Sequence, residues 1–155
     1  MDLFHQFNQI IRALNQHNVE YVLIGGYAVI LHGLPRTTQD MDIVVKSNEE
    51  NIRKFQQALK SLYDDKEIEE ITRDELQKYA VIRYGTPENF YIDIMAGIGE
   101  AENFDSIESE VKEIGDISIK VATAEALYRM KQNTLRPHDK ADALFLRDLI
   151  ESKNE

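Results

Sequence analysis

The chain has 155 residues, of which 43% are apolar and 30% are charged, and its formal net charge is −10. This length suffices for one compact core, and the composition is that of a globular rather than a disordered protein. Because the sequence has no cysteine, it has neither a disulfide framework nor a thiolate metal site. The excess of negative charge excludes strong non-specific binding to nucleic acid through general electrostatic attraction.

The sequence also indicates no membrane partner. No segment reaches the roughly 20 consecutive apolar residues of a membrane-spanning helix. The N-terminal segment has no basic start, and its apolar residues recur at helical spacing, so it does not resemble a signal peptide. We therefore expect a cytoplasmic protein.

The N-terminal part of the chain alternates helical patterns with short apolar runs. Apolar residues recur at helical spacing over residues 3–17, and the apolar run at 21–24 predicts a strand that stops at two glycines. In chain order we then expect a short helix over 26–32, a strand over 41–45, and a helix that Ser47 caps and that extends to about residue 63.

The remainder is predicted to be rich in strands up to two final helices. The expected elements are a loop over 64–77 that could include a helical turn, strands over 78–85 and 89–97 joined by a turn, a short helix over 105–111, a strand over 117–121, and helices over 124–134 and 137–152. Because these elements mix without strict alternation, we predict an α+β fold with a small mixed sheet packed by helices. We expect a single domain over 1–155, with a core to about residue 122 and C-terminal helices over about 123–152.

Three aspartates lie on strands that are otherwise built for burial. Side chains alternate along a strand, so Asp40 and Asp42 share a face opposite the apolar residues of 41–45. Asp93 likewise lies opposite the apolar face of its own strand. If the two strands are neighbours, the three carboxylates could converge.

Converging carboxylates repel one another, and a divalent cation would remove that conflict. Oxygen ligands without nearby histidine or cysteine favour Mg²⁺ or Mn²⁺. The turn at Gly25 and Gly26, between a strand and a helix, could present backbone N–H groups to phosphate. Each feature alone has a simpler explanation: a pair of aspartates can lie on a solvated edge, and two glycines can form a tight turn.

Taken together, these features resemble the nucleotidyltransferase superfamily with the DNA polymerase β-like fold. The segment LIGGYAVILHGLPRTTQDMDIVV is most similar to small prokaryotic AbiEii/AbiGii-toxin-like nucleotidyltransferases. The matching positions are Gly25, Gly26, Ala28, His32, Gly33, Arg36, Thr38, Asp40 and Asp42. The C-terminal segment resembles the last helices of these proteins at Lys131, Arg136, Lys140 and Asp142.

The resemblance implies transfer of a nucleoside monophosphate from an NTP to an acceptor hydroxyl. Carried over to this sequence, Asp40 and Asp42 would bind both metal ions. Asp93 would bind the catalytic ion and help to deprotonate the acceptor. Gly25 and Gly26 would cradle the β- and γ-phosphates, although many members of the superfamily have serine at the second position.

Two basic residues complete the expected nucleotide site. Lys131 shares a helix face with Leu127 and Thr134 and could reach the triphosphate, or it could be an ordinary surface lysine. Arg36, in the loop before the aspartates, could contact phosphate or pair with a carboxylate. We interpret His32, at a helix end, as structural.

The sequence leaves three functions open. The first is an active, Mg²⁺-dependent nucleotidyltransferase whose acceptor is a protein, a tRNA or a small molecule. The second is a toxin–antitoxin component with this fold that acts by binding a cognate toxin or antitoxin protein. The third is a nucleotide sensor without turnover. Tyr79, Tyr84 and Tyr91 could stack on a base, or they could simply pack against the sheet.

Overall fold

The computed structural model describes residues 3–35, 38, 40–99, 102–131 and 137–153. The helices are α1 (Leu3–Gln16), α2 (Gly25–Leu31), α3 (Glu49–Lys60), the 3-10 helix η1 (Lys66–Glu70), α4 (Arg73–Lys78), α5 (Ala124–Lys131) and α6 (Pro137–Lys153). The strands are β1 (Tyr21–Ile24), β2 (Asp40–Val45), β3 (Ile82–Gly85), β4 (Tyr91–Met95), β5 (Gly97–Ile98), β6 (Glu102–Asn103), β7 (Ser109–Ile114) and β8 (Ile117–Ala122).

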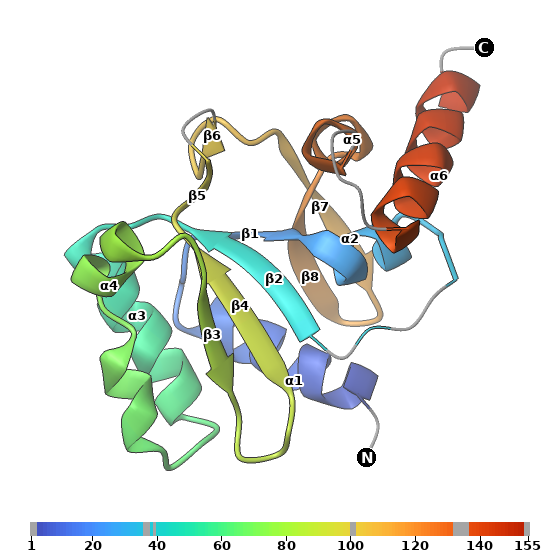
Figure 1. Ribbon diagram of the computed structural model, residues 1–155. Helices are drawn as coiled ribbons and strands as arrows, with labels where there is room; N and C mark the ends of the chain where they lie inside the picture. Colours follow the sequence, from blue (N-terminus) through green and yellow to red (C-terminus); the bar gives the residue numbers. More distant parts are fainter. Residues whose placement is uncertain (1–2, 36–37, 39, 100–101, 132–136, 154–155) are drawn as a thin grey trace.

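A mixed sheet forms the centre of the molecule. Within the described residues it has six strands in the order β3-β4-β2-β1-β8-β7, and β5 and β6 form a separate two-stranded sheet (Figure 1). The pairs β2–β4 and β1–β8 are parallel, whereas β1–β2, β3–β4 and β7–β8 are antiparallel. The predicted α+β class, with a mixed sheet packed by helices, is confirmed.

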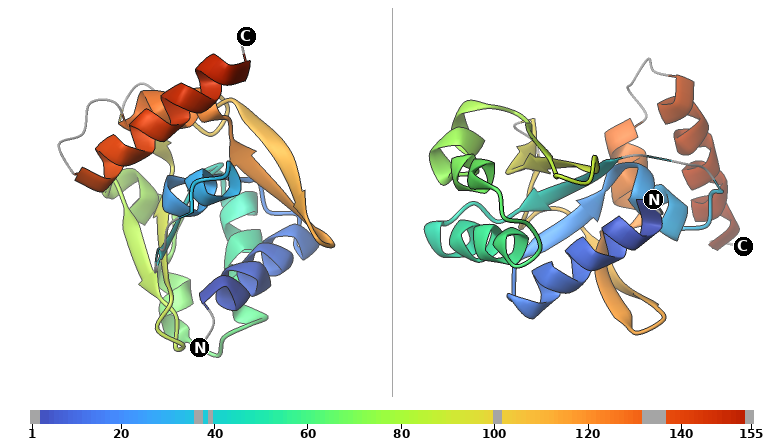
Figure 2. Two further views of the ribbon diagram at one scale, coloured as in Figure 1. Left: turned by 90° about the vertical axis from the view of Figure 1, so that its right-hand side faces the viewer. Right: turned by 90° about the horizontal axis from the view of Figure 1, so that it is seen from below.

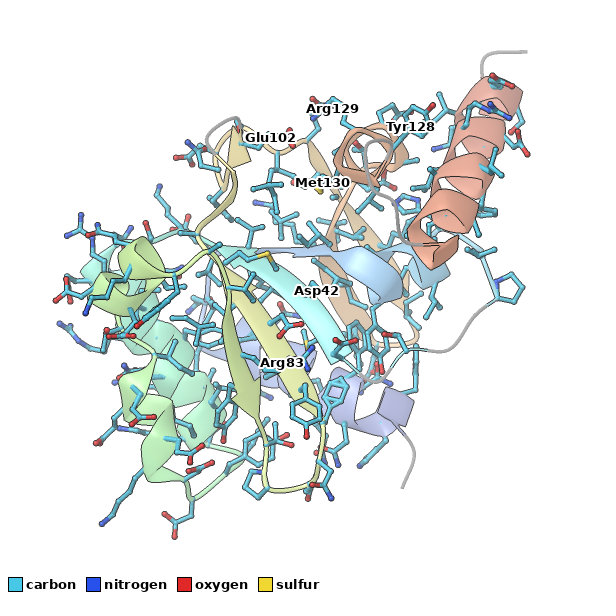
Figure 3. All side chains as sticks on the ribbon, in the orientation of Figure 1. Asp42, Arg83, Glu102, Tyr128, Arg129 and Met130 are labelled. Carbon is cyan, nitrogen blue, oxygen red and sulfur yellow. The ribbon has the colours of Figure 1, made fainter. Side chains whose placement is uncertain are left out.

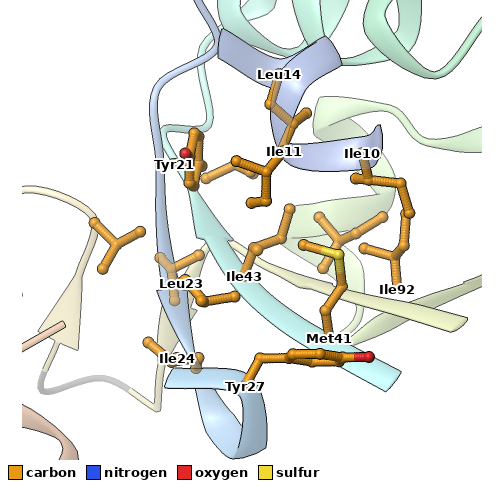
Figure 4. Close-up of a cluster of buried hydrophobic side chains, with 14 of the residues drawn as sticks. Ile10, Ile11, Leu14, Tyr21, Leu23, Ile24, Tyr27, Met41, Ile43 and Ile92 are labelled. Atoms are coloured by element: carbon orange, nitrogen blue, oxygen red, sulfur yellow. The ribbon is translucent and has the colours of Figure 1, made fainter. Parts of the chain in front are cut away.

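Different pairs of helices lie on the two sides of the sheet. Helices α1 and α3 lie together on one face, whereas α5 and α6 pack against each other on the opposite side, next to α2 (Figure 2). The strand residues that face α1 are apolar, and Met41 and Ile43 are fully buried among Ile10, Ile11 and Leu14 (Figure 4). Burial of this apolar surface is the dominant favourable contribution to folding.

The buried residues of the sheet and of the C-terminal helices belong to one hydrophobic cluster. Ala124 and Leu127 of α5 and Leu146 of α6 are fully buried in the same cluster as the strand residues. We therefore propose that residues 1–155 form a single domain. Among the described residues, we find no helix whose length and apolar content would allow it to cross a membrane.

Two details of the region from 47 to 78 differ from the predictions. Helix α3 is capped by Asn48 instead of Ser47, because the Asn48 side chain accepts a hydrogen bond of 2.7 Å from the backbone N–H of Asn51. The segment predicted as a loop that could include a helical turn contains two short helices, η1 and α4. The side chains of Asp65 and Thr72 cap these helices, because they accept hydrogen bonds from the backbone N–H groups of Glu67 and Glu75.

The predicted helix over 105–111 is wrong. Residues Ser109–Ile114 form β7, which pairs along its whole length with β8 through a tight turn at Gly115. The local sequence favours a helix, but Ser109, Glu110 and Val111 pair with Ala122, Val121 and Lys120 of the following strand. Such a tertiary pairing overrides a weak local preference.

His32 connects the end of α2 to β8. Its Nε2 donates a hydrogen bond of 2.9 Å to the carbonyl oxygen of Ala122, and the residue is only 9% exposed. The structural interpretation therefore agrees with this contact, although the partner is a strand carbonyl and not the helix terminus. Burial lowers the pKa of His32 below the ordinary value for histidine.

This lowered pKa predicts a loss of stability in mild acid. The unfolded histidine takes up a proton near its ordinary pKa of about 6.5, whereas folded His32 resists it, so the free energy of unfolding falls as the pH drops through that value, by up to about 1.4 kcal/mol per pH unit. The variant His32→Gln keeps an N–H donor and should lose this dependence. Urea unfolding at about pH 7.5 and about pH 5.5 measures it. An equal decrease in both proteins would contradict the prediction.

Candidate active site

Three charged side chains form a row across neighbouring strands. Asp42 of β2 is the register partner of Asp93 on the parallel strand β4, and Asp93 is in turn the register partner of Arg83 on β3. Because register partners on adjacent strands share a face and lie about 5 Å apart, the backbone alone brings these side chains together. Figure 3 shows Asp42, on the inner strand β2, and Arg83, on the edge strand β3.

Asp40 joins the row from the start of β2. It lies two residues before Asp42 and therefore on the same face of the strand. The hydroxyl of Thr38 donates to the Asp40 carboxylate (3.0 Å) and lies within 3.2 Å of its backbone carbonyl oxygen. This contact orients the Asp40 side chain at the point where the chain enters the sheet. The structure thus groups the three predicted aspartates on one face.

Arg83 holds two of these carboxylates. Its Nε and Nη2 donate to the two oxygens of Asp93 at 2.8 and 3.1 Å, and Nη2 also donates to Asp40 at 2.9 Å. The guanidinium lies over the ring of Tyr91, 5.1 Å from its centroid. The hydrogen bonds to Asp93, together with the nearby negative charge, raise the pKa of Arg83 above its ordinary value. The arginine therefore stays charged and neutralises part of the acidic cluster.

Burial explains why the cluster needs this cation. Asp93 is only 8% exposed, and a buried carboxylate is costly unless it is paired and hydrogen-bonded. Arg83 supplies both the charge and two well-aligned donors. The sequence pattern alone does not identify Arg83. It indicates a strand there, but not the register that places Arg83 opposite Asp93.

Gly25 makes room for Asp42. Its φ is +72°, a backbone conformation that is unfavourable for residues other than glycine. A Cβ atom at this position would lie 2.8 Å from Cγ of Asp42, closer than carbon atoms can approach. At Gly26 a Cβ would lie 3.3 Å from the Thr38 side chain, which is tight but not prohibitive. Gly25 therefore leaves space for Asp42 itself, and Gly26 leaves space for Thr38, which orients Asp40.

This arrangement predicts that Gly25→Ala is far more harmful than the same change in an open turn. Gly115 also has a positive φ, +63°, but a Cβ there would meet nothing within 4 Å. Gly115→Ala should lower the free energy of unfolding by about 1–2 kcal/mol from backbone strain alone. Gly25→Ala adds overpacking against Asp42 and should cost about 2–5 kcal/mol.

Chemical denaturation of both variants and of Gly25→Ala/Asp42→Ala tests the contact. The added Asp42→Ala change removes the atoms that the new Cβ would meet, so it should restore part of the stability lost in Gly25→Ala. If the two single variants lose equal stability, or if the double variant recovers none, Gly25 is not required by Asp42.

The carboxylates fit a hard divalent cation by chemistry but are not arranged around one. The three expected ligands offer only oxygen atoms, as Mg²⁺ and Mn²⁺ prefer. Yet within the part of the chain that the structure describes, no three histidine, cysteine or acidic side chains are grouped so as to hold a metal ion. Instead the guanidinium of Arg83 lies on Asp40 and Asp93.

The expected phosphate-binding residues are placed only in part. Gly25 and Gly26 form the first turn of α2, directly after β1. Arg36 lies outside the described residues. Lys131 is the last residue of α5, and the described structure does not extend to its side chain. The predicted roles of these residues therefore stay predictions.

The three tyrosines considered for base stacking separate into two groups. Tyr84 is buried, and its hydroxyl donates to Asp65 at 2.8 Å, so it serves packing. Tyr91 is 38% exposed and is the register partner of Asp40 on β2. Tyr79 and Val81, which precede β3, are 54% and 46% exposed, and Tyr79 lies with Ala96 at the other end of β4. Of the two exposed rings, Tyr91 therefore borders the acidic row.

A second charged cluster lies beside α5. Arg129 pairs with Glu102 at 2.7 Å and with Glu108 at 3.3 Å, and so ties α5 to β6 and to the segment before β7. Figure 3 shows Arg129 and Glu102 together, apart from Asp42. Glu102 also lines a cavity of about 330 Å³, which Tyr79 and Ala96 border as well. Ala96 is three residues beyond Asp93, so this cavity lies at the end of β4.

Solved structures with the same fold are nucleotidyltransferases. A lincosamide antibiotic adenylyltransferase, LnuA, in its lincomycin-bound form matches with a TM-score of 0.60 at 18% identity, over 90% of this chain and 93% of that one. A putative nucleotidyltransferase from Thermotoga maritima matches with a TM-score of 0.54 at 16% identity, over 96% and 92%. ANT(2″)-Ia in complex with adenylyl-2″-tobramycin matches with a TM-score of 0.53 at 12% identity, over 92% and 85%. At these identities the likeness establishes the fold, which is that of the nucleotidyltransferases.

The sequence profile of the AbiEii nucleotidyl transferase toxins of type IV toxin–antitoxin systems matches residues 9–150. Since this match includes nearly the whole chain, the protein belongs to that family. A comparison with curated proteins gave no match. The resemblance inferred from the sequence, to the nucleotidyltransferase superfamily and to its AbiEii-like members, is confirmed.

Proposed function

We propose that this protein is a metal-dependent nucleotidyltransferase that moves a nucleoside monophosphate from an NTP to a hydroxyl of an acceptor. Membership of the AbiEii family supports nucleotidyl transfer in general. The observation that carries the specific proposal is the register of Asp42 with Asp93 on parallel neighbouring strands, with Asp40 on the same face. Such a concentration of carboxylates at the centre of a sheet has no evident value for packing.

Asp40, Asp42 and Asp93 would hold the metal, which is Mg²⁺ or Mn²⁺ by the preference of oxygen ligands. A divalent cation bound there supplies neutralisation of the phosphate charge and lowers the pKa of a nearby hydroxyl. Gly25 and Gly26, with Arg36 and Lys131, are the proposed contacts to the triphosphate. We also propose that the reaction takes place in the cytoplasm, where NTPs are available.

The proposed step needs a base and an in-line attack. The acceptor hydroxyl transfers its proton to the carboxylate of Asp93 while its oxygen forms a bond to the α-phosphorus. The bond between the α-phosphorus and the bridging oxygen of pyrophosphate breaks, and pyrophosphate leaves with that oxygen. Asp93 is the proposed base because it lies beside Asp42 in the row, and Arg83, which now donates to both of its oxygens, would have to release it first.

The exposed ring of Tyr91, beside Asp40 in the row, offers a place for a planar or apolar group. Aromatic rings can stack on a nucleobase or on an acceptor. Tyr79 is a second exposed ring, at the other end of β4. Structural neighbours were solved with lincomycin and with an adenylylated tobramycin. A small molecule is therefore one acceptor class to test, together with proteins and tRNA.

Transfer from labelled NTPs tests the proposal directly. The purified chain is incubated with each of the four α-labelled NTPs, Mg²⁺ and a cell extract, and labelled products are measured. Asp42→Asn should lower labelling by at least about 100-fold, because it removes a charged ligand without altering size. Asp116→Asn is the matched control. Asp116 pairs with Arg12 at the surface, so its loss should leave labelling unchanged.

Undiminished labelling by Asp42→Asn would contradict the assignment. Both variants are first compared by circular dichroism and thermal unfolding, so that a loss of fold is not read as a loss of chemistry.

The second candidate is a toxin–antitoxin component that acts by binding its cognate protein. The family description, which names a type IV system, favours this possibility. The triple change of Asp40, Asp42 and Asp93 to Asn separates the two. If the triple variant still captures the product of the neighbouring gene and keeps its biological effect, binding is the function. If capture persists but the effect is lost, transfer is the function.

A further inference from the structure

We propose that Arg83 is a built-in counter-cation of the aspartates, and that a divalent cation must displace it from Asp93 and Asp40 in order to bind. This inference rests on the proposed role of the aspartates as cation ligands. Arg83 belongs to no motif of the sequence, and the structure places it in the site. Arg83 is thus a positioning residue in the cation-free protein and a competitor of the cation.

The competition follows from the atoms involved. Arg83 directs N–H groups at both carboxylate oxygens of Asp93 and at one oxygen of Asp40. An ion that uses these oxygens would lie where the guanidinium hydrogens now point. Two positive groups at such short range repel strongly in a partly buried site. Arg83 and a cation therefore exclude each other at these oxygens.

The position of Arg83 allows this exchange without a change in the sheet. Its side chain is 55% exposed, whereas that of Asp93 is 11% exposed. It extends from β3, the strand at one edge of the sheet, while the aspartates lie on the inner strands β4 and β2. Tyr91 offers an aromatic face beside it. One rotation of a solvent-accessible side chain would expose the carboxylates.

Binding of Mn²⁺ alone to the full chain tests the proposal without any activity measurement. The concentration of free Mn²⁺ is followed by electron paramagnetic resonance. Arg83→Gln keeps much of the length but removes the charge, and it should bind Mn²⁺ at least about tenfold more tightly than the unaltered protein. Arg83→Lys keeps the charge without the two-pronged geometry and should fall between them.

Arg129→Gln is the matched control. Arg129 also pairs with two carboxylates, those of Glu102 and Glu108, but away from the aspartates. Its removal should leave the Mn²⁺ affinity within about twofold of the unaltered protein. A gain in Arg129→Gln equal to that in Arg83→Gln would mean that general charge is responsible, and the proposal would fall.

Thermal unfolding gives a second readout. Without metal, Arg83→Gln should unfold at a lower temperature than the unaltered protein, because its carboxylates repel without a counter-charge. Saturating Mg²⁺ should raise the midpoint of Arg83→Gln more than that of the unaltered protein, since the ion binds the variant more tightly. If Arg83→Gln folds only with Mn²⁺ present, that also supports the proposal.

The proposal is overturned if Arg83→Gln binds Mn²⁺ no more tightly than the unaltered protein, or not at all. The proposed function is judged separately, by NTP labelling. If Asp42→Asn abolishes labelling while Arg83→Gln leaves Mn²⁺ affinity unchanged, the enzyme stands and only the exchange is refuted. If labelling persists in Asp42→Asn, the assignment of the aspartates fails.

Discussion

Mutual repulsion among carboxylates is the constraint around which this structure is arranged. Asp42 and Asp93 cannot separate, because the parallel pairing of β2 and β4 sets their spacing. Their strands also supply the apolar face under α1, so moving the acids apart would disrupt the core. The molecule meets this constraint with a cation from the next strand, and Arg83 lies within hydrogen-bonding distance of two of the acids.

The same constraint accounts for features of the backbone around the site. The left-handed conformation and missing side chain of Gly25 leave space for Asp42. Thr38 lies against Gly26 and donates to Asp40. The turn that we propose as a phosphate contact therefore also makes room for the acids. Both roles require a small residue, so the presence of glycine does not by itself separate them.

The local parts of this arrangement could be predicted from the sequence, and the non-local parts could not. Alternation along β2 placed Asp40 and Asp42 opposite the core, because the period of a strand is fixed by its geometry. Which strands are neighbours depends on contacts between distant segments. Arg83 was therefore missed, although its strand was predicted. The helix predicted over 105–111 has a different cause: residues 109–111 begin a strand that pairs with the next one, β8, and their own local pattern does not show this.

The predicted start of α3 was wrong by one residue for a different reason. Several side chains near a helix start can serve as its cap, and Ser47 and Asn48 are both suitable by type. The difference is one residue, and in the structure the Asn48 side chain is the one that accepts the N–H of Asn51. Recognition of the family from the glycine and aspartate spacing succeeded because that spacing is dictated by chemistry and topology together.

The placement of β3 at the edge of the sheet has a consequence for how proteins of this architecture diversify. The acids belong to inner strands, whose substitutions are constrained from both sides, whereas β3 has a single neighbouring strand within the described residues and follows the exposed Val81. Apart from Arg83, which binds the acids, exposed positions along this margin can therefore change while the acidic cluster stays unaltered. An acidic cluster on inner strands beside such a margin allows the neighbouring surface to vary without rebuilding the scaffold.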